Sequence, residues 1–436
     1  MLRIVKKRRR SEPVSRPRDI DVIIEVSPLA IMGMVALALD LLGIARALPG
    51  VAYRAAVAYT AGLIAVGRRA TAARINRFLG GVSHDALTRL REQDRVCVPT
   101  VILAFIRIVH MLGVPGYLCL DDTFIPHERS KKMDGVYWDF DHALNRNVLG
   151  TRIVVLVWSN GFFRIPVGFA LWHKKGARPV YRSKNELARL LLRWAIHRKI
   201  KPEYVTFDNW YASKENMQFI AKELKLEFAT RLKKNARLNW NGRRVQARTI
   251  GTRLLAGTRA YRRDGTVARA TQVVVGELGA MTFVVTTDDL DGQGAGVRYL
   301  LGSAPRDSAA RVVERYRNRW IIETLFEDAK QCLSLQSYQG RTLDGQMTHI
   351  ALCFAGIVAL DAMRAQSGMT FGQAVEAARR LVFARTARGE YELVSLAPAP
   401  LGTLEDLGDA KRVVADALDA VSQLRLPEGS HARAAA

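Results

Sequence analysis

The chain has 436 residues, of which 49% are hydrophobic, and its 66 lysines and arginines against 41 acidic residues give a formal net charge of +25. This hydrophobic fraction excludes a wholly disordered chain, and the length exceeds that of one ordinary domain. The excess positive charge favours a polyanionic partner, with nucleic acid first, because basic side chains that neutralise phosphates release their counterions.

Neither the cysteines nor the apolar runs indicate export or a membrane. The four cysteines are scattered and form no C-x-x-C pair, which is typical of a protein in a reducing cytoplasm. An apolar run begins at Leu29, but Asp40 interrupts it before it is long enough to cross a bilayer. We therefore expect buried helices there and no membrane partner; a tilted span that includes Asp40 and Arg46 is the alternative.

The N-terminal part of the chain indicates a basic arm followed by a helical region. Residues 1–26 are basic, contain proline and lack periodicity, which predicts a flexible arm. From 27 to 112 the pattern is helical, and two short predicted helices meet at the turn Gly80-Gly81, with Ser83 as the cap of the second. Arginines surround this pair, at positions 68, 69, 74, 77, 89 and 91. The pattern predicts a helix-turn-helix that binds DNA, and a small helical hairpin without that role fits it equally well.

Residues 113–232 alternate between strand and helix patterns. The β-type runs "GYLCLDDTF", "TRIVVLVW" and "FFRIPVGFALW" precede an amphipathic helix pattern, "SKNELARLLLRWAIHRK". The segment "PEYVTFDNWY" then repeats the arrangement of a short strand that ends in an aspartate, and a helix pattern follows it. This alternation, which opens with a hairpin, predicts an α/β (α+β) core with a mixed central sheet.

The second half of the chain predicts a β-rich insertion, a long helix and a tail. Residues 233–300 contain β-type runs separated by turns, which indicates a β-rich insertion in the core. One long helix is expected to start from a cap at Asp307 or Ser308, and residues 301–390 would complete the core with C-terminal helices. Residues 391–436 are expected to form a loose C-terminal tail.

Four acidic residues stand where their carboxylates could meet. Asp121 and Asp122 end one predicted strand, Asp208 ends another, and Glu323 lies on the long helix. The aspartates can converge only if the two strands are neighbours in the sheet, with the helix packed on it. Such an oxygen-rich cluster is typical of a site for Mg²⁺ or Mn²⁺. A single aspartate is more typical of a turn or a helix cap, so only the joint placement favours a metal site.

The long helix also carries a charged stripe. With about 100° of rotation per residue, one narrow face receives Tyr316, Arg319, Glu323, Glu327 and Lys330. A solvated helix face with (i, i+4) ion pairs has a similar composition. The stripe by itself therefore does not show whether this helix face is exposed to solvent or binds a ligand.

The same helix belongs to a longer pattern. The spacing Tyr-x2-Arg-x3-Glu-x6-Lys is kept on Tyr316, Arg319, Glu323 and Lys330, after the segments "LDDT" and "TFDNWY". Over roughly residues 116–363 the chain resembles the DDE transposases of bacterial insertion sequences, in the branch with the YREK signature (IS-four type). The resemblance implies an RNase H-like mixed-sheet catalytic core with a β-rich insertion, beside the all-helical N-terminal DNA-binding region.

The resemblance also implies the identity of the catalytic residues. Asp121, Asp208 and Glu323 would be catalytic and would bind two Mg²⁺ or Mn²⁺ ions per active site. Asp122 is the second candidate in the first motif, because neighbouring side chains on a strand point to opposite faces and only one of the two can bind the metal. Glu327 is an alternative to Glu323 as the glutamate ligand, and only the signature spacing favours Glu323.

Phosphate contacts near the cleaved DNA end are implied for three residues of the signature, Tyr316, Arg319 and Lys330. Lys131 and Lys132, which follow the first motif, are further candidates, and a solvated loop fits them equally well. Tyr299 in the insertion could stack on a base, although such a residue is more often a core aromatic.

The function implied by the resemblance is that of a DNA transposase in a bacterial cytoplasm, associated with the nucleoid. It would cut insertion-sequence ends and join their 3′-hydroxyls to target DNA by two-metal phosphoryl transfer. Its partners would be double-stranded DNA, as terminal inverted repeats and as target, and a second copy of the chain in a homodimer. One alternative is an RNase H-like metal-dependent nuclease without strand transfer. The other is a non-catalytic DNA-binding protein derived from a transposase, against which the three filled acidic positions count.

Overall fold

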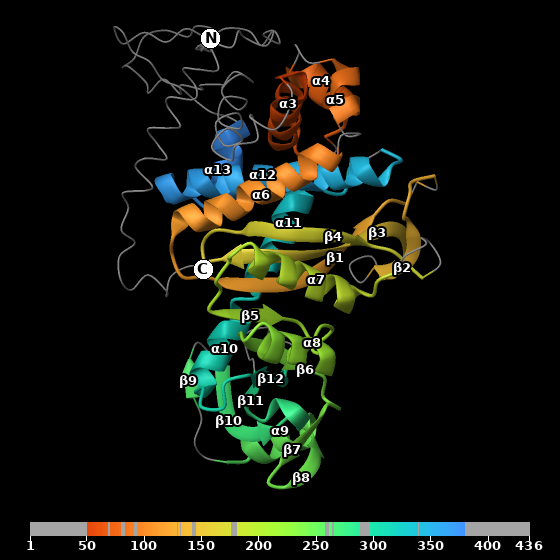
Figure 1. Ribbon diagram of the computed structural model, residues 1–436. Coiled ribbons are helices and arrows are strands. Elements are labelled where there is room, and N and C mark those ends of the chain that lie inside the picture. Colours follow the sequence, from red (N-terminus) through yellow and green to blue (C-terminus); the bar gives the residue numbers. More distant parts are fainter. Residues whose placement is uncertain are drawn as a thin grey trace, which may run out of the picture. The chain divides into compact units, whose positions relative to one another are not determined.

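The computed structural model describes residues 50–379, with gaps at 69, 80–82, 91–93, 129, 131, 142–144, 176–180, 258–260, 264–265, 288–295 and 339. The predicted basic arm, the apolar run that begins at Leu29 and the C-terminal tail lie outside the described residues. The chain divides into two compact units (Figure 1). The helical unit comprises Met1–Ile108, Ser130–Asp134 and Glu327–Ala436, and the sheet unit comprises Val109–Arg129 and Gly135–Phe326.

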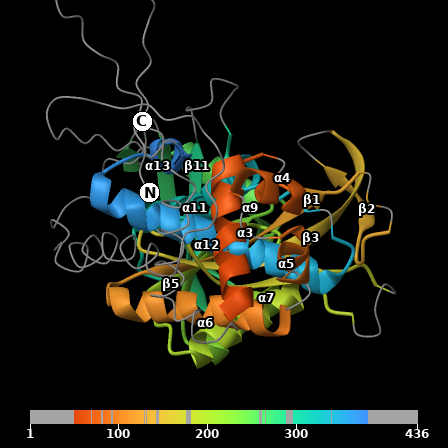
Figure 2. The ribbon, with the colours of Figure 1, turned by 90° about the horizontal axis from the view of Figure 1, so that it is seen from above.

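The helical unit is built around α3 (Gly50–Val66). The α3 sequence is rich in alanine and most of its side chains are buried, so neighbouring helices can approach it closely. It packs against α4 (Ala72–Leu79), α5 (His84–Leu90), α12 (Leu343–Ser367) and α13 (Phe371–Arg379). Figure 2 shows α3 crossing α12. The helix α6 (Asp94–Leu112) then leads into the first strand.

The contact between α3 and α12 joins distant parts of the chain. The Tyr59 hydroxyl lies 2.9 Å from Nδ1 of His349, and both side chains are buried. A Cβ added at Gly356 would lie 2.3 Å from the Leu333 side chain, so glycine permits the close packing at this point. The described residues from Glu327 to Arg379 thus belong to the helical unit, whereas the sequence pattern assigned residues up to 390 to the core.

The expected pair of short helices is present as α4 and α5. The hydroxyl of Ser83 accepts a hydrogen bond from the N–H of Ala86 at 3.1 Å, which caps the second helix as expected. The turn Gly80-Gly81 lies outside the described residues. A role of this pair in binding DNA stays a prediction.

One helix of the described part is long and apolar enough to cross a membrane by length and composition, and it is the stretch Leu343–Ala362 of α12. However, 83% of that stretch is buried inside the protein. A core helix shows such burial, so the stretch is weak evidence for a membrane span.

The sheet unit contains one mixed sheet, in which hydrogen bonds connect all 12 described strands. The core strands are β1 (Tyr117–Pro126), β2 (Tyr137–Asp141), β3 (Arg146–Ser159), β4 (Ile165–Trp172), β5 (Tyr204–Phe207) and β6 (Glu227–Leu232). Within the core, β1, β3 and β4 pair antiparallel, and β5 pairs in parallel with β1 on one side and β6 on the other. The resulting order β4-β3-β1-β5-β6 confirms the predicted RNase H-like mixed α/β fold.

Helices connect the core strands and cover the sheet. The helix α7 (Lys184–His197) packs on β3 and β4 (Figure 1). It starts at a capping box, in which the Ser183 hydroxyl accepts from the N–H of Glu186 and the Glu186 carboxylate accepts from the N–H of Ser183. A short helix, α8 (Lys214–Gln218), and the π-helical turn η1 (Phe219–Glu223) connect β5 to β6.

The predicted β-rich insertion continues the core sheet. Its elements are β7 (Arg237–Trp240), β8 (Arg243–Gln246), α9 (Ala247–Leu255), β9 (Tyr261–Arg263), β10 (Thr266–Val274), the 3₁₀ turn η2 (Gly276–Leu278), β11 (Ala280–Thr287) and β12 (Arg298–Gly302). The last strand, β12, pairs with β6, and the order runs on through β11, β10, β7 and β8. The β7–β8 hairpin turns at Asn241 and Gly242, whose φ angles of 50° and 77° suit a tight hairpin turn.

The prediction of one long helix that starts from a cap at Asp307 or Ser308 and carries the signature is wrong, because a turn divides it into α10 (Ala309–Arg317) and α11 (Trp320–Cys332). At the turn the N–H of Ile321 donates to the carbonyl oxygen of Asn318 at 3.3 Å, an i→i−3 bond of the 3₁₀ type. The Nδ2 of Asn318 also donates to the Tyr204 hydroxyl of β5 at 2.7 Å. This contact with a distant strand holds the turn in place. The helical periodicity of the sequence cannot predict such a contact.

Candidate active site

Asp121 and Asp208 lie where the parallel pairing of β1 with β5 ends. The last registered pair is Leu120 with Phe207, so each aspartate directly follows it. β5 ends at Phe207 as predicted. The predicted end of β1 at the aspartates is wrong, because pairing with β3 continues this strand to Pro126. Asp121 is therefore held inside an extended strand, whereas Asp208 starts a turn.

Glu323 is connected to this strand end through Arg319. Nη1 of Arg319 lies 2.9 Å from Oδ2 of Asp121, and Nη2 donates to Oε1 of Glu323. The exposed fractions of the side chains are 12% for Arg319, 19% for Asp121 and 32% for Glu323. One guanidinium thus contacts two carboxylates that the fold brings together from a strand and a helix.

Tyr316 connects the second aspartate to the same guanidinium. Its hydroxyl donates a long hydrogen bond of 3.4 Å to Oδ1 of Asp208. The guanidinium of Arg319 lies over the Tyr316 ring, 5.4 Å from the ring centroid. The sheet unit therefore brings five of the predicted site residues into one cluster, which we call the acidic cluster: Asp121, Asp208, Tyr316, Arg319 and Glu323.

The charge of Asp121 is only partly compensated in this arrangement. Burial raises the pKa of its carboxyl to about 7, Arg319 opposes that rise, and the negative charges of Asp122 and Asp208 add to it. The N–H of Asp122 donates to Oδ1 of Asp121 at 2.8 Å and favours the charged form. Asp121 and Glu323 thus share the guanidinium of Arg319, and Asp208 has the Tyr316 hydroxyl as its donor.

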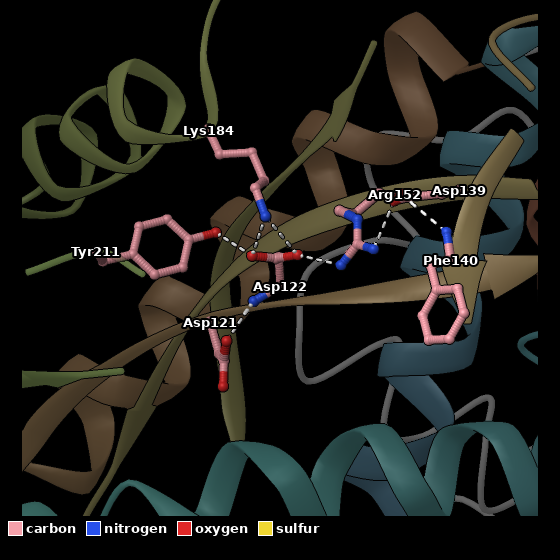
Figure 3. A network of polar contacts seen from close by, with 7 residues as sticks. All are labelled: Asp121, Asp122, Asp139, Phe140, Arg152, Lys184 and Tyr211. Carbon is pink, nitrogen blue, oxygen red and sulfur yellow. Dashed lines mark hydrogen bonds and ion pairs between the residues drawn. The ribbon is translucent and has the colours of Figure 1, made fainter. Parts of the chain in front are cut away.

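Asp122 points to the opposite face of β1 and belongs to a separate network (Figure 3). Its Oδ2 lies 2.7 Å from Nη1 of Arg152, and its Oδ1 lies 3.0 Å from Nζ of Lys184 and accepts from the Tyr211 hydroxyl at 2.7 Å. The other Nη of Arg152 lies 2.7 Å from Oδ2 of Asp139. A metal ion could bind Asp122 only after displacing these donors, so the structure disfavours it as a metal ligand.

The remaining candidates lie elsewhere. Glu327 and Lys330 on α11 fall in the helical unit, as does the exposed Lys132. The Oε1 of Glu327 accepts a hydrogen bond from Nε2 of Gln331 at 2.8 Å. Lys131 lies outside the described residues.

Tyr299 is packed within the insertion. Its ring is nearly parallel to that of Phe283, with centroids 6.3 Å apart and an interplanar angle of 20°. A Cβ added at Gly251 of α9 would lie 2.6 Å from the same ring. These contacts favour a core aromatic over a base-stacking residue.

The sequence model of the DDE superfamily endonucleases matches residues 46–278, more than half of the chain. The chain belongs to this family. The match includes Asp121 and Asp208, and it ends before Glu323 and the rest of the signature. No curated protein sequence matches the chain. DDE superfamily endonucleases generally use divalent metal ions, and the family implies DNA as the substrate.

The carboxylate oxygens of the acidic cluster are chemically suited to bind divalent metal ions. In this structure, however, no group of three or more His, Cys, Asp or Glu side chains among the described residues is arranged to hold one. Carboxylate oxygens are the ligands that Mg²⁺ and Mn²⁺ prefer. A cation, the guanidinium of Arg319, lies between Asp121 and Glu323. Its buried Nε has no hydrogen-bond partner among the described residues, so this cation is incompletely held.

Several residues that organise the site did not stand out in the sequence. Tyr211 lies in the segment "TFDNWY", where the aspartate drew attention, and Arg152 and Lys184 lie in a strand and a helix pattern. One signal was present: alternation along β1 sends Asp122 away from Asp121, so a buried Asp122 needs cations on its own face. The sequence does not say which cations supply this charge.

We expect Asp122→Asn to lower the free energy of unfolding by about 3 kcal/mol. The substitution leaves Arg152 and Lys184, which are both largely buried, without the negative charge that they contact. The exposed fractions are 7% for Asp122, 18% for Arg152 and 12% for Lys184. The matched control is Glu128→Gln, which breaks an exposed ion pair with Arg146 and should cost less than about 1 kcal/mol. Urea unfolding measures both, and equal losses in the two variants would contradict the structural role of the Asp122 network.

Proposed function

We propose that the protein is a DNA transposase of the DDE type, which cuts the ends of an insertion sequence and joins their 3′-hydroxyls to target DNA. The observation that carries the proposal is the acidic cluster. Asp121 and Asp208 follow the last pair of two parallel strands, and Arg319 connects Asp121 to Glu323. Membership of the DDE superfamily endonucleases supports cleavage of DNA, and the YREK spacing supports the transposase branch.

Each residue of the acidic cluster has a role in this proposal. Asp121, Asp208 and Glu323 would hold two Mg²⁺ or Mn²⁺ ions. Bound ions of this kind activate an attacking oxygen and stabilise the leaving oxygen of a phosphodiester. The burial of Asp121 and Arg319 limits the access of water, which strengthens the electrostatic interactions in the cluster.

Arg319 and Tyr316 would then contact the DNA backbone. The two Nη groups of Arg319, which contact one carboxylate each in the free protein, can instead donate to two oxygens of a phosphate. Lys330, further along α11, would contribute a third contact, as the YREK spacing implies. Recognition of terminal inverted repeats by the N-terminal helices, a homodimer that holds two ends together and an association with the nucleoid belong to the same proposal.

Exposed basic residues of the insertion support a DNA partner. From Arg231 to Arg263 the chain contains no aspartate or glutamate. Exposed basic residues in the described part of this segment are Lys233, Lys234, Arg237, Arg243, Arg244, Arg248 and Arg253. Without carboxylates nearby in the chain, these cations are available to phosphates, and the β7–β8 hairpin projects Arg243 and Arg244 beside its turn.

A metal-dependent nuclease without strand transfer is the second candidate, because the family match supports cleavage and does not extend to joining. The two functions separate in an assay with duplex ends that are already cut and carry free 3′-hydroxyls. A transposase joins such ends to a supercoiled target plasmid when Mg²⁺ is present. Cleavage of intact ends without any joining of the cut ends would reject the transposase and leave the nuclease.

We expect Asp208→Asn and Glu323→Gln each to reduce DNA cleavage by more than about 100-fold, beyond the effect typical of residues that only support metal ligands. Binding of end DNA, measured by fluorescence anisotropy in EDTA, should stay within a few-fold of wild type. Glu327→Gln is the matched control, because Glu327 lies one turn further along α11 and binds Gln331. Full activity of either site variant, or equal loss in the control, would reject the assignment.

We expect the double variant Arg243→Gln with Arg244→Gln to bind duplex DNA more weakly at all sequences. Two lost phosphate contacts should lower the slope of log affinity against log salt by about 2. The control is Arg193→Gln, which removes an exposed arginine of the same unit that pairs with Glu223. An unchanged slope in the double variant would show that Arg243 and Arg244 do not contact the DNA backbone.

A further inference from the structure

Tyr211 is fully buried, with 0% exposure, and its hydroxyl donates to Oδ1 of Asp122 at 2.7 Å (Figure 3). Neither residue belongs to the acidic cluster. Both nevertheless stand next to it in the chain, because Asp122 adjoins Asp121 and Tyr211 lies in the turn that Asp208 begins.

Hydrogen bonds of backbone N–H groups connect this pair to Asp121 and Asp208. The N–H of Asp122 donates to Oδ1 of Asp121 at 2.8 Å. The N–H of Tyr211 donates to the carbonyl oxygen of Asp208 at 3.0 Å, which closes the turn. A short chain of contacts therefore runs from one cluster aspartate to the other through the Asp122–Tyr211 bond.

The sheet alone leaves Asp208 poorly restrained relative to Asp121. The parallel pairing of β1 with β5 has three registered pairs and stops at Leu120 and Phe207. Asp208 lies beyond the last pair in a turn, where the chain has more freedom than in a strand. A restraint between this turn and β1 must come from side chains, and the Tyr211 hydroxyl supplies one.

The acceptor of this hydrogen bond is itself firmly held. Asp122 also contacts Arg152 at 2.7 Å and Lys184 at 3.0 Å, which come from β3 and α7. Arg152 contacts Asp139 of β2 in turn. Asp122 is therefore anchored directly from two other elements and through Arg152 from a third, and a hydrogen bond to it transmits that rigidity to the Asp208 turn.

We propose that Tyr211 is a positioning residue, whose hydrogen bond to Asp122 holds the Asp208 turn against β1 and thereby sets the affinity of Asp121 and Asp208 for divalent cations. The inference rests on the proposed metal-binding role of the two aspartates. Tyr211 touches neither metal nor DNA in this proposal. It acts from the opposite face of the strand, where its hydroxyl donates to Asp122.

The test measures binding of Mn²⁺ alone to the full chain, by the electron paramagnetic resonance signal of free Mn²⁺. Tyr211→Phe removes the hydroxyl and keeps the ring. We expect it to weaken Mn²⁺ binding by about 10-fold, as loss of a residue that orients a metal ligand typically does. Tyr117→Phe is the matched control, since Tyr117 is also a buried tyrosine (5% exposed) and lies at the other end of β1. Its Mn²⁺ affinity should equal that of wild type.

A second variant separates positioning from general stability. Asp122→Asn keeps an oxygen acceptor for the Tyr211 hydroxyl and loses the charge that Arg152 and Lys184 contact. We expect it to lower the thermal unfolding midpoint more than Tyr211→Phe does, and to weaken Mn²⁺ binding less. If Asp122→Asn instead lowers both the unfolding midpoint and the Mn²⁺ affinity more than Tyr211→Phe does, the proposal is overturned in favour of a purely structural role.

Two failures are distinguishable in the same experiment. If wild type binds Mn²⁺ no better than Asp208→Asn does, the proposed metal site itself is wrong and the positioning role fails with it. If wild type binds clearly better than Asp208→Asn and Tyr211→Phe binds like wild type, the metal site stands and only the role of Tyr211 is overturned.

Discussion

The parallel pairing of β1 with β5 is the contact on which the candidate site depends. β5 has only four residues, all of them buried, and three of them pair with β1. A shift of this register by one residue would turn the side chains of β5 to the opposite faces of the sheet and separate Asp208 from Asp121. Burial of apolar side chains on both strands therefore determines where two carboxylates stand, although the carboxylates themselves oppose being buried together.

The carboxylates on the two faces of β1 have different partners. On one face, Arg152 contacts both Asp122 and Asp139, and Lys184 also contacts Asp122, so each carboxylate has a cation beside it. On the other face Arg319 contacts Asp121 and Glu323, and Asp208 accepts a hydrogen bond from the Tyr316 hydroxyl. The Asp122 network stabilises the fold around β1. The carboxylate oxygens of the acidic cluster are the kind of ligand that Mg²⁺ and Mn²⁺ prefer.

The turn between α10 and α11 is what brings Arg319 to the cluster. Asn318 donates to the Tyr204 hydroxyl at 2.7 Å, and its carbonyl oxygen lies 3.5 Å from the thiol sulfur of Cys119. These contacts hold the turn against the beginnings of β5 and β1. Arg319 is the next residue, so its guanidinium reaches both Asp121 and Glu323, one turn along α11. A continuous helix would not make the contacts of this turn with the sheet.

The sequence by itself determined the chemistry and the local elements of this protein. Strand patterns that place Asp121 and Asp208 at the ends of apolar runs, the capping pair Ser183 and Glu186 and the net charge of +25 are all properties of neighbouring residues or of composition. Only the tertiary structure decided that β1 and β5 are neighbours, that Asp122 faces Tyr211, that a turn divides the signature helix and that α12 packs on α3. Each of these depends on contacts between residues far apart in the chain, and local periodicity does not encode which distant segments will pair.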